Sequence, residues 1–202
     1  MTKNTTDIDV GQFRKADHPI EPIFWKRWSP RAMSGAPITD AELMTMLEAA
    51  RWAPSSYNSQ PWRFLYAKRG TANWDTFFGL LGEGNQAWCK HAAVLFVIVA
   101  RNYLDAIKAP AITHMFDAGA AWGNLALQGT KMGLVVHGMQ GFDYAKAKGA
   151  LGVPDDYAVC AMVAVGRPGT MEQIPEGARE REKPNPRKPI AEWAFEGRFR
   201  AG

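Results

Sequence analysis

The sequence predicts an α+β domain in which a mixed sheet lies between two layers of helices, a three-layer α/β/α sandwich. Segments with helical periodicity and segments with strand character interleave, without the strict βαβ alternation of a doubly wound fold. Residues 93–100 form a continuous apolar run, which is typical of a strand covered on both faces. The chain has 202 residues and is 47% hydrophobic, which suits one well-buried core and is too little for two ordinary domains.

Capping and helix-breaking residues set the expected boundaries of the elements. Residues 1–22 are polar without a sustained period, so we expect an N-terminal arm with no chemistry ahead of a single domain at 23–202. Thr39 and Glu42 form a capping box, which predicts a helix that ends before Pro54. The later elements are expected as strands at 63–67, 93–100, 134–139 and 157–166 and as helices at 112–132 and 142–151, the former ended by Gly133.

The C-terminal region, residues 167–202, is rich in proline and charge and ends in apolar anchors. Trp193, Phe195 and Phe199 follow a stretch that contains five prolines. Such a segment is semi-rigid and extended, and its aromatic residues need a surface to bury against. The pattern therefore predicts an arm that wraps a surface.

Composition and spacing exclude several classes of protein. The net charge is +4 and the basic residues are scattered, which argues against a nucleic-acid surface. The apolar run at 92–100 is about half of the roughly 20 residues that a membrane-spanning helix needs. Neither Cys89 and Cys160 nor the four histidines have metal-ligand spacing, and no residue has a recognisable nucleophile context. We expect a cytoplasmic protein without a metal site.

The first cluster with chemical character is the pentapeptide Arg27-Trp28-Ser29-Pro30-Arg31. A guanidinium offers forked donors that match phosphate oxygens, and a serine hydroxyl adds a neutral donor. The cluster is consistent with a phosphate site and equally with a solvated basic turn.

The second cluster is the loop at residues 53–62, APSSYNSQPW, in which short polar side chains lie between two prolines. It would present several hydrogen-bonding groups on a stiff frame, although a plain connection anchored by Trp62 accounts for the same residues.

A third pattern, residues 82–87, matches the dinucleotide fingerprint G-x-G-x-x-A. We reject it because that fingerprint needs a strand before it and a helix after it, whereas a buried strand is expected to follow.

The order and spacing of these segments resemble the nitroreductase family over roughly residues 23–195. The resemblance rests on RWSPR, a capped helix ending in APSSYNSQPW, Asn85, the strand AVLFVIVA, a glycine-rich helix with Asn124, MQGFD at 139–143, GVPDDYAVCAMVAVGRP, and RKPI at 187–190. It implies a largely antiparallel sheet and a homodimer in which the C-terminal arm wraps the partner. It also implies two non-covalent FMN sites at the subunit interface.

The resemblance further implies hydride transfer from NAD(P)H through FMN to nitroaromatics, quinones or a related small electron-poor acceptor, by a ping-pong mechanism. No side chain is expected to be catalytic, because the flavin carries the chemistry. The alternatives are a specialised member of the same fold, such as a dehalogenase, a flavin-fragmenting enzyme or an enal reductase, and a non-catalytic flavin-binding protein.

Carried over by position, the family's cofactor contacts fall on fourteen residues. The residues at the phosphate or ribityl chain would be Arg27, Trp28, Ser29, Arg31 and Arg187. The loop of the partner subunit would contribute Pro54, Ser55, Ser56 and Asn58. Asn85 would contact the ring edge, and the turn at flavin N5 would be formed by His137, Gly138, Gln140 and Gly141. Gly138 and Gln140 stand where better-known members often have Pro and Glu, and Trp88 and Asn185 stand where some relatives have lysine. Trp88 is expected either over the substrate space or as an ordinary core or interface residue.

Overall fold

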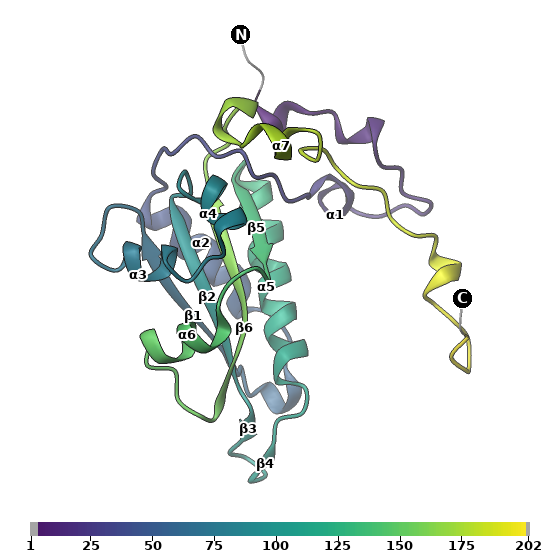
Figure 1. Cartoon of the computed structure of the whole chain (residues 1–202). Coiled ribbons are helices and arrows are strands. Elements are labelled where there is room, and N and C mark those ends of the chain that lie inside the picture. The colour runs from purple at the N-terminus through teal and green to yellow at the C-terminus, as the bar shows by residue number, and fades with distance from the viewer. Residues whose placement is uncertain (1–3, 201–202) are drawn as a thin grey trace.

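The structure is a computed structural model and describes residues 4–200 (Figure 1). Short 3₁₀ turns supplement its regular elements. The α-helices are α1 (Pro22–Lys26), α2 (Asp40–Arg51), α3 (Trp74–Phe78), α4 (Glu83–Cys89), α5 (His114–Lys131), α6 (Tyr144–Ala150) and α7 (Glu176–Arg179). The strands are β1 (Trp62–Lys68), β2 (Val94–Arg101), β3 (Tyr103–Leu104), β4 (Ala109–Pro110), β5 (Val135–Met139) and β6 (Tyr157–Gly166).

The central sheet has four strands in the order β1-β2-β6-β5. Its three pairings, β1 with β2, β2 with β6 and β5 with β6, are all antiparallel. Strand β2 therefore lies inside the sheet, as its continuous apolar run predicts, and residues 94–100 are buried. Strands β3 and β4 pair separately in a short hairpin that projects from one end of the body (Figure 1).

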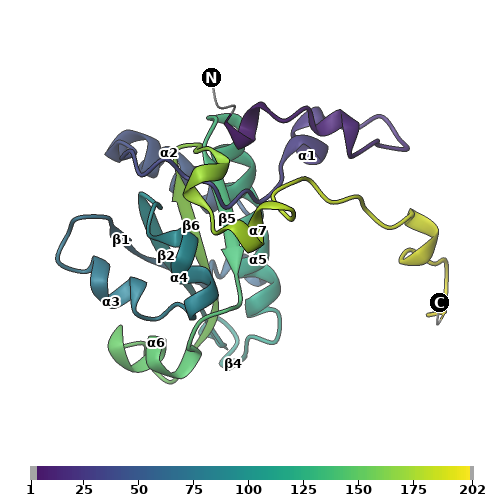
Figure 2. The same cartoon turned by 45° about the horizontal axis from the view of Figure 1, so that its top comes forward.

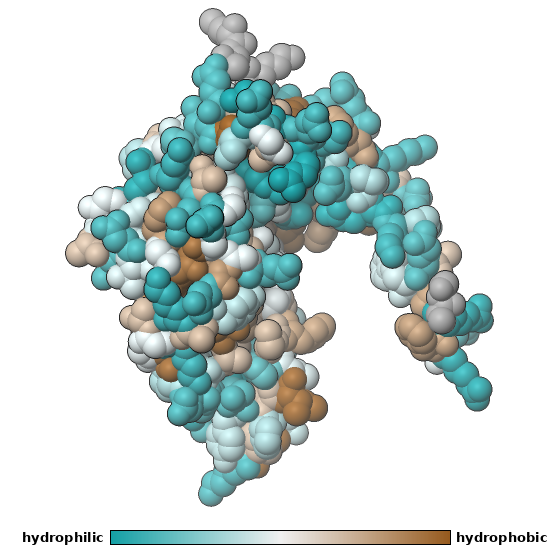
Figure 3. All heavy atoms as spheres, viewed as in Figure 1, coloured by the Kyte–Doolittle hydropathy of each residue, from teal (hydrophilic) through white to brown (hydrophobic). Residues whose placement is uncertain are grey.

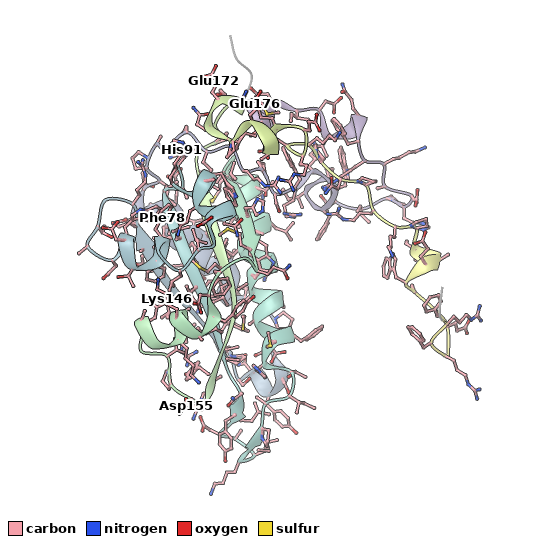
Figure 4. The ribbon with its side chains drawn as sticks, in the orientation of Figure 1. Phe78, His91, Lys146, Asp155, Glu172 and Glu176 are labelled. Carbon is pink, nitrogen blue, oxygen red and sulfur yellow. The ribbon has the colours of Figure 1, made fainter. Side chains whose placement is uncertain are left out.

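Two helical layers cover the two faces of the sheet and confirm the three-layer sandwich. Side chains of α2 and α5 pack on one face, around Phe96 and Ile98 of β2. Helices α3, α4 and α6 supply Phe77, Trp88 and Ala147 to the core on the other face. Within that second layer, Lys146 Nζ donates to the Gly79 carbonyl at 2.9 Å, which ties α6 to the end of α3 beside Phe78 (Figure 4).

Local sequence patterns account for most of the element boundaries. Thr39 caps α2 by accepting the amide of Glu42, and the Glu42 carboxylate accepts the Thr39 amide at 2.8 Å, so the capping box is confirmed. Gly133, expected to end the long helix α5, has φ of +74°, a conformation in which glycine carries no steric penalty. The four strands and two helices expected after the capped helix each differ from the observed bounds by two residues or fewer at either end.

One reason given for rejecting the dinucleotide fingerprint at residues 82–87 is wrong. Gly82 is the N-cap of helix α4, so a helix follows the glycines directly and β2 comes later. The rejection still holds because helix α3, and not a strand, is the element directly before Gly82. Leu81 makes only an isolated bridge to Phe142.

Two extended segments leave the sandwich on the same side. Residues 4–26, which include α1, run beside the start of the C-terminal segment, and residues 185–200 then extend away from the body (Figure 2). The space-filling view shows open space between this arm and the body (Figure 3). Trp193 is 62% exposed and Phe199 is 88% exposed on the arm. Among the described residues, no helix is long and apolar enough to cross a membrane.

Candidate functional site

Three guanidinium groups lie close together where the N-terminal and C-terminal segments meet the body. Arg27 donates through Nη1 to the Ser29 hydroxyl at 3.2 Å, so the pair expected at the phosphate is assembled. Burial lowers the pKa of Arg27, and the neighbouring charge of Arg187 lowers it further. Arg14 completes the cluster, and burial together with Arg187 and Arg27 lowers its pKa to about 10. The cluster therefore brings together three guanidinium groups, a side chain that stays charged in proteins.

These three cations have no carboxylate partner in the part of the chain that the structure describes. The salt bridges found within residues 4–200 involve other basic residues. Like charges held together without a counterion raise the free energy of the folded chain, and a bound anion removes that cost. The cluster can therefore bind a phosphate group.

Arg31 and Trp28, from the same motif, have different surroundings. The Glu182 carboxylate is buried and accepts the backbone amides of Arg31 at 2.6 Å and Ala32 at 2.9 Å, and Arg31 Nη1 lies 3.5 Å from it. The charge of Arg31 is thus offset within the chain, and this arginine is the weaker candidate for a phosphate contact. Trp28 is 8% exposed and packs into the body.

His137 joins the RWSPR segment to strand β5. Its Nδ1 lies 2.8 Å from the Pro30 carbonyl, which only accepts, so Nδ1 carries the proton. The pKa of His137 is lowered to about 4. Burial is the main cause, the nearby charges of Arg31 and Arg27 also lower it, and the backbone hydrogen bonds act in the opposite direction. The imidazole is therefore neutral at physiological pH and acts as a fixed link between the two segments.

The turn after β5 is held by the start of helix α4. Asn85 Nδ2 donates to the Gly141 carbonyl at 3.0 Å, and the Gly82 amide donates to the same oxygen at 3.0 Å. Asn85 and the turn residues Gln140 and Gly141, which were assigned to one flavin ring, therefore lie together. Because Gln140 and Gly141 are exposed, their backbone groups are accessible to a ligand.

The glycine at position 138 has a packing reason. A Cβ at Gly138 would lie 3.1 Å from the indole of Trp122 on α5, closer than ordinary contact. The absence of a side chain thus lets α5 and the edge strand β5 approach each other. A hollow of about 340 Å³ beside them is lined by Trp122, Gly138, Gln140 and Tyr144, among others.

The loop at residues 53–62 is strained and tied to the first turn of α5. Tyr57, Asn58 and Gln60 have φ between +46° and +53°, which costs of order 1 kcal/mol or more for each residue that has a Cβ. The buried carboxylate of Asp117 accepts the Ser56 amide at 3.1 Å and stabilises this conformation. Such strain is typical of loops shaped for a ligand.

This loop and the arginine cluster lie at opposite ends of helix α5. The RWSPR segment reaches the C-terminal end, where Trp28 and Pro30 line a hollow with Thr130. Ser56 contacts Asp117 in the first turn. Thirteen residues separate Asp117 from Thr130, about 20 Å of helix at 1.5 Å per residue. A single chain therefore does not bring the assigned loop residues against the arginine cluster.

Packing decides the place of Trp88, which the sequence left open, and the reactivity of Cys89. The Trp88 side chain is 2% exposed in the core, with its ring 4.7 Å from that of His137, so the alternative of an ordinary core residue holds. Burial raises the pKa of the Cys89 thiol and makes it unreactive. Within residues 4–200, no cluster of three potential metal ligands occurs.

Sequence reasoning missed three residues that organise the site: Arg14, Asp117 and Glu182. Arg14 was dismissed with the N-terminal arm, and Glu182 lies in a charged, proline-rich stretch that gives no sign of a buried carboxylate. Asp117 stands in a helix where an acidic residue near the N-terminus is ordinary. Each acts through backbone groups distant in the sequence, which local patterns do not reveal.

A model of the nitroreductase family matches residues 25–73 and 69–167, most of the chain. The chain belongs to this family. A solved structure described as an oxidoreductase containing FMN is 44% identical, with a TM-score of 0.89, and the match covers 94% of this chain and 97% of that one.

Two curated relatives in sequence extend the comparison. An NADH dehydrogenase of Thermus thermophilus is 30% identical over 174 residues, covering 71% of this chain and 83% of its own length. An uncharacterised 15.4 kDa protein of Mycolicibacterium smegmatis is 32% identical over 146 residues, covering 68% of this chain and 97% of its own. The family assignment thus rests on sequence as well as on fold.

The half-buried, neutral His137 predicts that this nitroreductase family member loses stability in mild acid. Between the pKa of 6.5 in the unfolded chain and about 4 in the folded chain, the unfolded state binds more protons, so the free energy of unfolding falls as the pH falls. The full effect is roughly 3 kcal/mol. We expect His137→Asn, which keeps a donor for Pro30 but does not titrate, to lose less stability than wild type between pH 7.5 and 4.5.

Urea unfolding at both pH values, with matched protein concentrations, measures the difference. Other titrating groups contribute equally to both proteins, so the comparison isolates the histidine. An identical loss of stability in the two proteins would contradict the assignment.

Proposed function

We propose that this protein is an FMN-dependent oxidoreductase that uses NAD(P)H to reduce a nitroaromatic, a quinone or a related small electron-poor acceptor. The observation that carries the proposal is the pair of cations Arg27 and Arg187, beside Ser29, which have no carboxylate partner within residues 4–200, in a fold of this family. The relative that shares 44% of its residues is described as containing FMN.

The residues present fit the parts of FMN. Forked guanidinium donors match phosphate oxygens, and the Ser29 hydroxyl adds a neutral partner. The exposed backbone of Gly138, Gln140 and Gly141 suits the edge of a planar ring because glycine allows close approach. When bound, FMN accepts hydride from NAD(P)H and returns electrons to the acceptor, which is the redox chemistry that no side chain here supplies.

The chain's own residues then bind, orient and exclude water. The Nδ1–H group of His137 is committed to the Pro30 carbonyl, so this side chain holds the cofactor-binding segment in place and moves no proton. Asn85 fixes the turn through Gly141, which keeps the backbone donors of the turn aligned. Preorganised donors of this kind favour the charge that develops on a reduced ring.

We further propose a homodimer whose two sites are each shared between the subunits. A two-fold axis that packs α5 antiparallel to its copy would bring the strained loop of one chain to the arginine cluster of the other. The exposed face of α5 supports this packing. Phe116 on α5 is 80% exposed and Ile112, just before the helix, is 90% exposed. Apart from the helix itself, no described residue lies within 4 Å of a Cβ placed at Gly119 or Gly123.

The first prediction of this proposal is that the purified protein carries about one non-covalent FMN per chain and that Arg27→Ala weakens its binding. Hydrogen bonds to charged groups contribute roughly 1.5–3 kcal/mol, equivalent to about a ten- to hundredfold change in affinity. Titration of the apo-protein with FMN measures it. Lys26→Ala, the exposed neighbouring residue, removes the same charge and serves as the control. A colourless protein that does not bind added FMN would refute the proposal.

Shared sites predict that two defective variants complement each other. Arg27→Ala damages the phosphate end, and Ser56→Trp blocks the loop at the other end. A heterodimer of the two, purified through different tags, has one site with both lesions and one with neither, so we expect about half of the wild-type FMN content. If each site belonged to a single chain, both sites of the heterodimer would be damaged and its FMN content would match that of the two variant homodimers.

A single ring for donor and acceptor predicts ping-pong kinetics. The donor and acceptor would occupy the same face of the flavin in turn, since the described residues hold no second nucleotide fingerprint in its required strand-to-helix setting. Initial rates over a grid of NADH and quinone concentrations should give parallel double-reciprocal lines. Intersecting lines, with a ternary complex detected by equilibrium binding, would show that the two substrates bind side by side.

A further inference from the structure

Arg14 lies outside every recognised motif, yet its guanidinium joins two distant parts of the chain. Nε donates to the Asn185 carbonyl at 2.6 Å. Nη1 donates to the carbonyls of Trp25 at 3.1 Å and Arg27 at 2.7 Å. The first oxygen belongs to the C-terminal arm, two residues before Arg187. The others belong to Trp25, just before the RWSPR segment, and to Arg27, its first residue. One side chain therefore fastens the arm beside the segment that carries Arg27.

These three bonds leave part of the Arg14 guanidinium unused. Nη2 has no hydrogen-bond partner among residues 4–200. Its free N–H groups belong to the same cluster as Arg27 and Arg187, since each of the two neighbours perturbs the titration of Arg14. A hollow of about 640 Å³ opens beside it, lined by Arg14, Arg187 and Lys188, by the acidic Asp17 and by apolar residues such as Trp193.

A purely structural clamp does not account for the charge at this position. Three backbone carbonyls could be bound by neutral donors, and neutral donors would avoid repulsion from two adjacent guanidiniums. A cation here costs free energy unless a dianionic group lies within the cluster. FMN carries such a group in its phosphate, and the planar fork of arginine matches it.

We propose that Arg14 is a third phosphate-binding guanidinium of the flavin site and that the same side chain positions Arg187 by holding the C-terminal arm. This inference rests on the proposed FMN function and extends it to the N-terminal segment. It also gives that segment a task, because residues 4–26 would then close the phosphate end of the site.

The test compares FMN with riboflavin, which has the same ring and ribityl chain but no phosphate. Apo-protein of the full chain is titrated with each ligand for wild type, Arg14→Gln, Arg14→Lys and Lys148→Gln. We expect Arg14→Gln to weaken FMN by about ten- to a hundredfold, the value of a hydrogen bond to a charged group, with riboflavin affinity nearly unchanged. Arg14→Lys should recover only part of the loss, because an ammonium lacks the fork that reaches all three carbonyls.

Lys148→Gln is the control for charge. Lys148 lies on α6 in an exposed ion pair with Asp155, away from the arginine cluster, so both affinities should stay at wild-type values. Equal losses of FMN and riboflavin affinity in Arg14→Gln would reduce Arg14 to a structural role and overturn the inference. Unchanged affinity for both ligands would also overturn it.

The outcome for wild type separates this inference from the function on which it rests. A wild-type protein that binds neither flavin refutes the proposed function itself. A wild-type protein that prefers FMN over riboflavin, with the preference intact in Arg14→Gln, leaves the function standing and removes Arg14 from the phosphate site.

Discussion

Strand β2 imposes the constraint on which the rest of the fold depends. Its residues 94–100 are apolar and buried on both faces, so the chain must cover both sides of the sheet. Helices α2 and α5 cover one side, and α3, α4 and α6 cover the other. Because β1 and β6 flank β2, strand β5 is left at the sheet edge beside α5, and the turn that follows it is exposed. The position of the candidate ligand site thus follows from where this apolar strand lies.

A buried carboxylate and a half-buried imidazole convert that scaffold into a site. Glu182 in the C-terminal segment accepts a hydrogen bond from the Arg31 amide, and His137 in β5 donates one to the Pro30 carbonyl. Both work through backbone groups, so they set the path of the chain rather than present a reactive atom. The buried Glu182 carboxylate accepts two backbone amides, and these hydrogen bonds offset the cost of removing the carboxylate from water. The arginines consequently meet in one place although they come from segments far apart in the sequence.

In the single chain, apolar surfaces are exposed and the two parts of the proposed site lie apart from each other. The aromatic residues of the arm and the apolar face of α5 are exposed, and the strained loop lies about 20 Å along α5 from the arginine cluster. Exposed apolar area of this kind marks an interaction surface. A symmetric partner along α5 would bury the face and complete the site in one step, which is why we treat dimerisation and cofactor binding as one proposal. The strain at Tyr57, Asn58 and Gln60 fits a loop whose shape serves a neighbour.

Most of the secondary structure, and the family, could be read from the sequence because their causes are local. The capping box at Thr39, the glycine after α5 and the apolar run of β2 each act within a few residues, and motif order carried the family. The roles of Arg14, Asp117 and Glu182 could not be read in this way. The Arg31 amide and Glu182 are separated by 151 positions, and no periodicity relates a side chain to a backbone group that far away. Only the tertiary structure decided that Arg31 pairs with Glu182 and that Trp88 belongs to the core. It also decided that Arg14 of the N-terminal segment lies beside Arg27 and Arg187. Burial and contacts between distant residues exist only once the layers have packed.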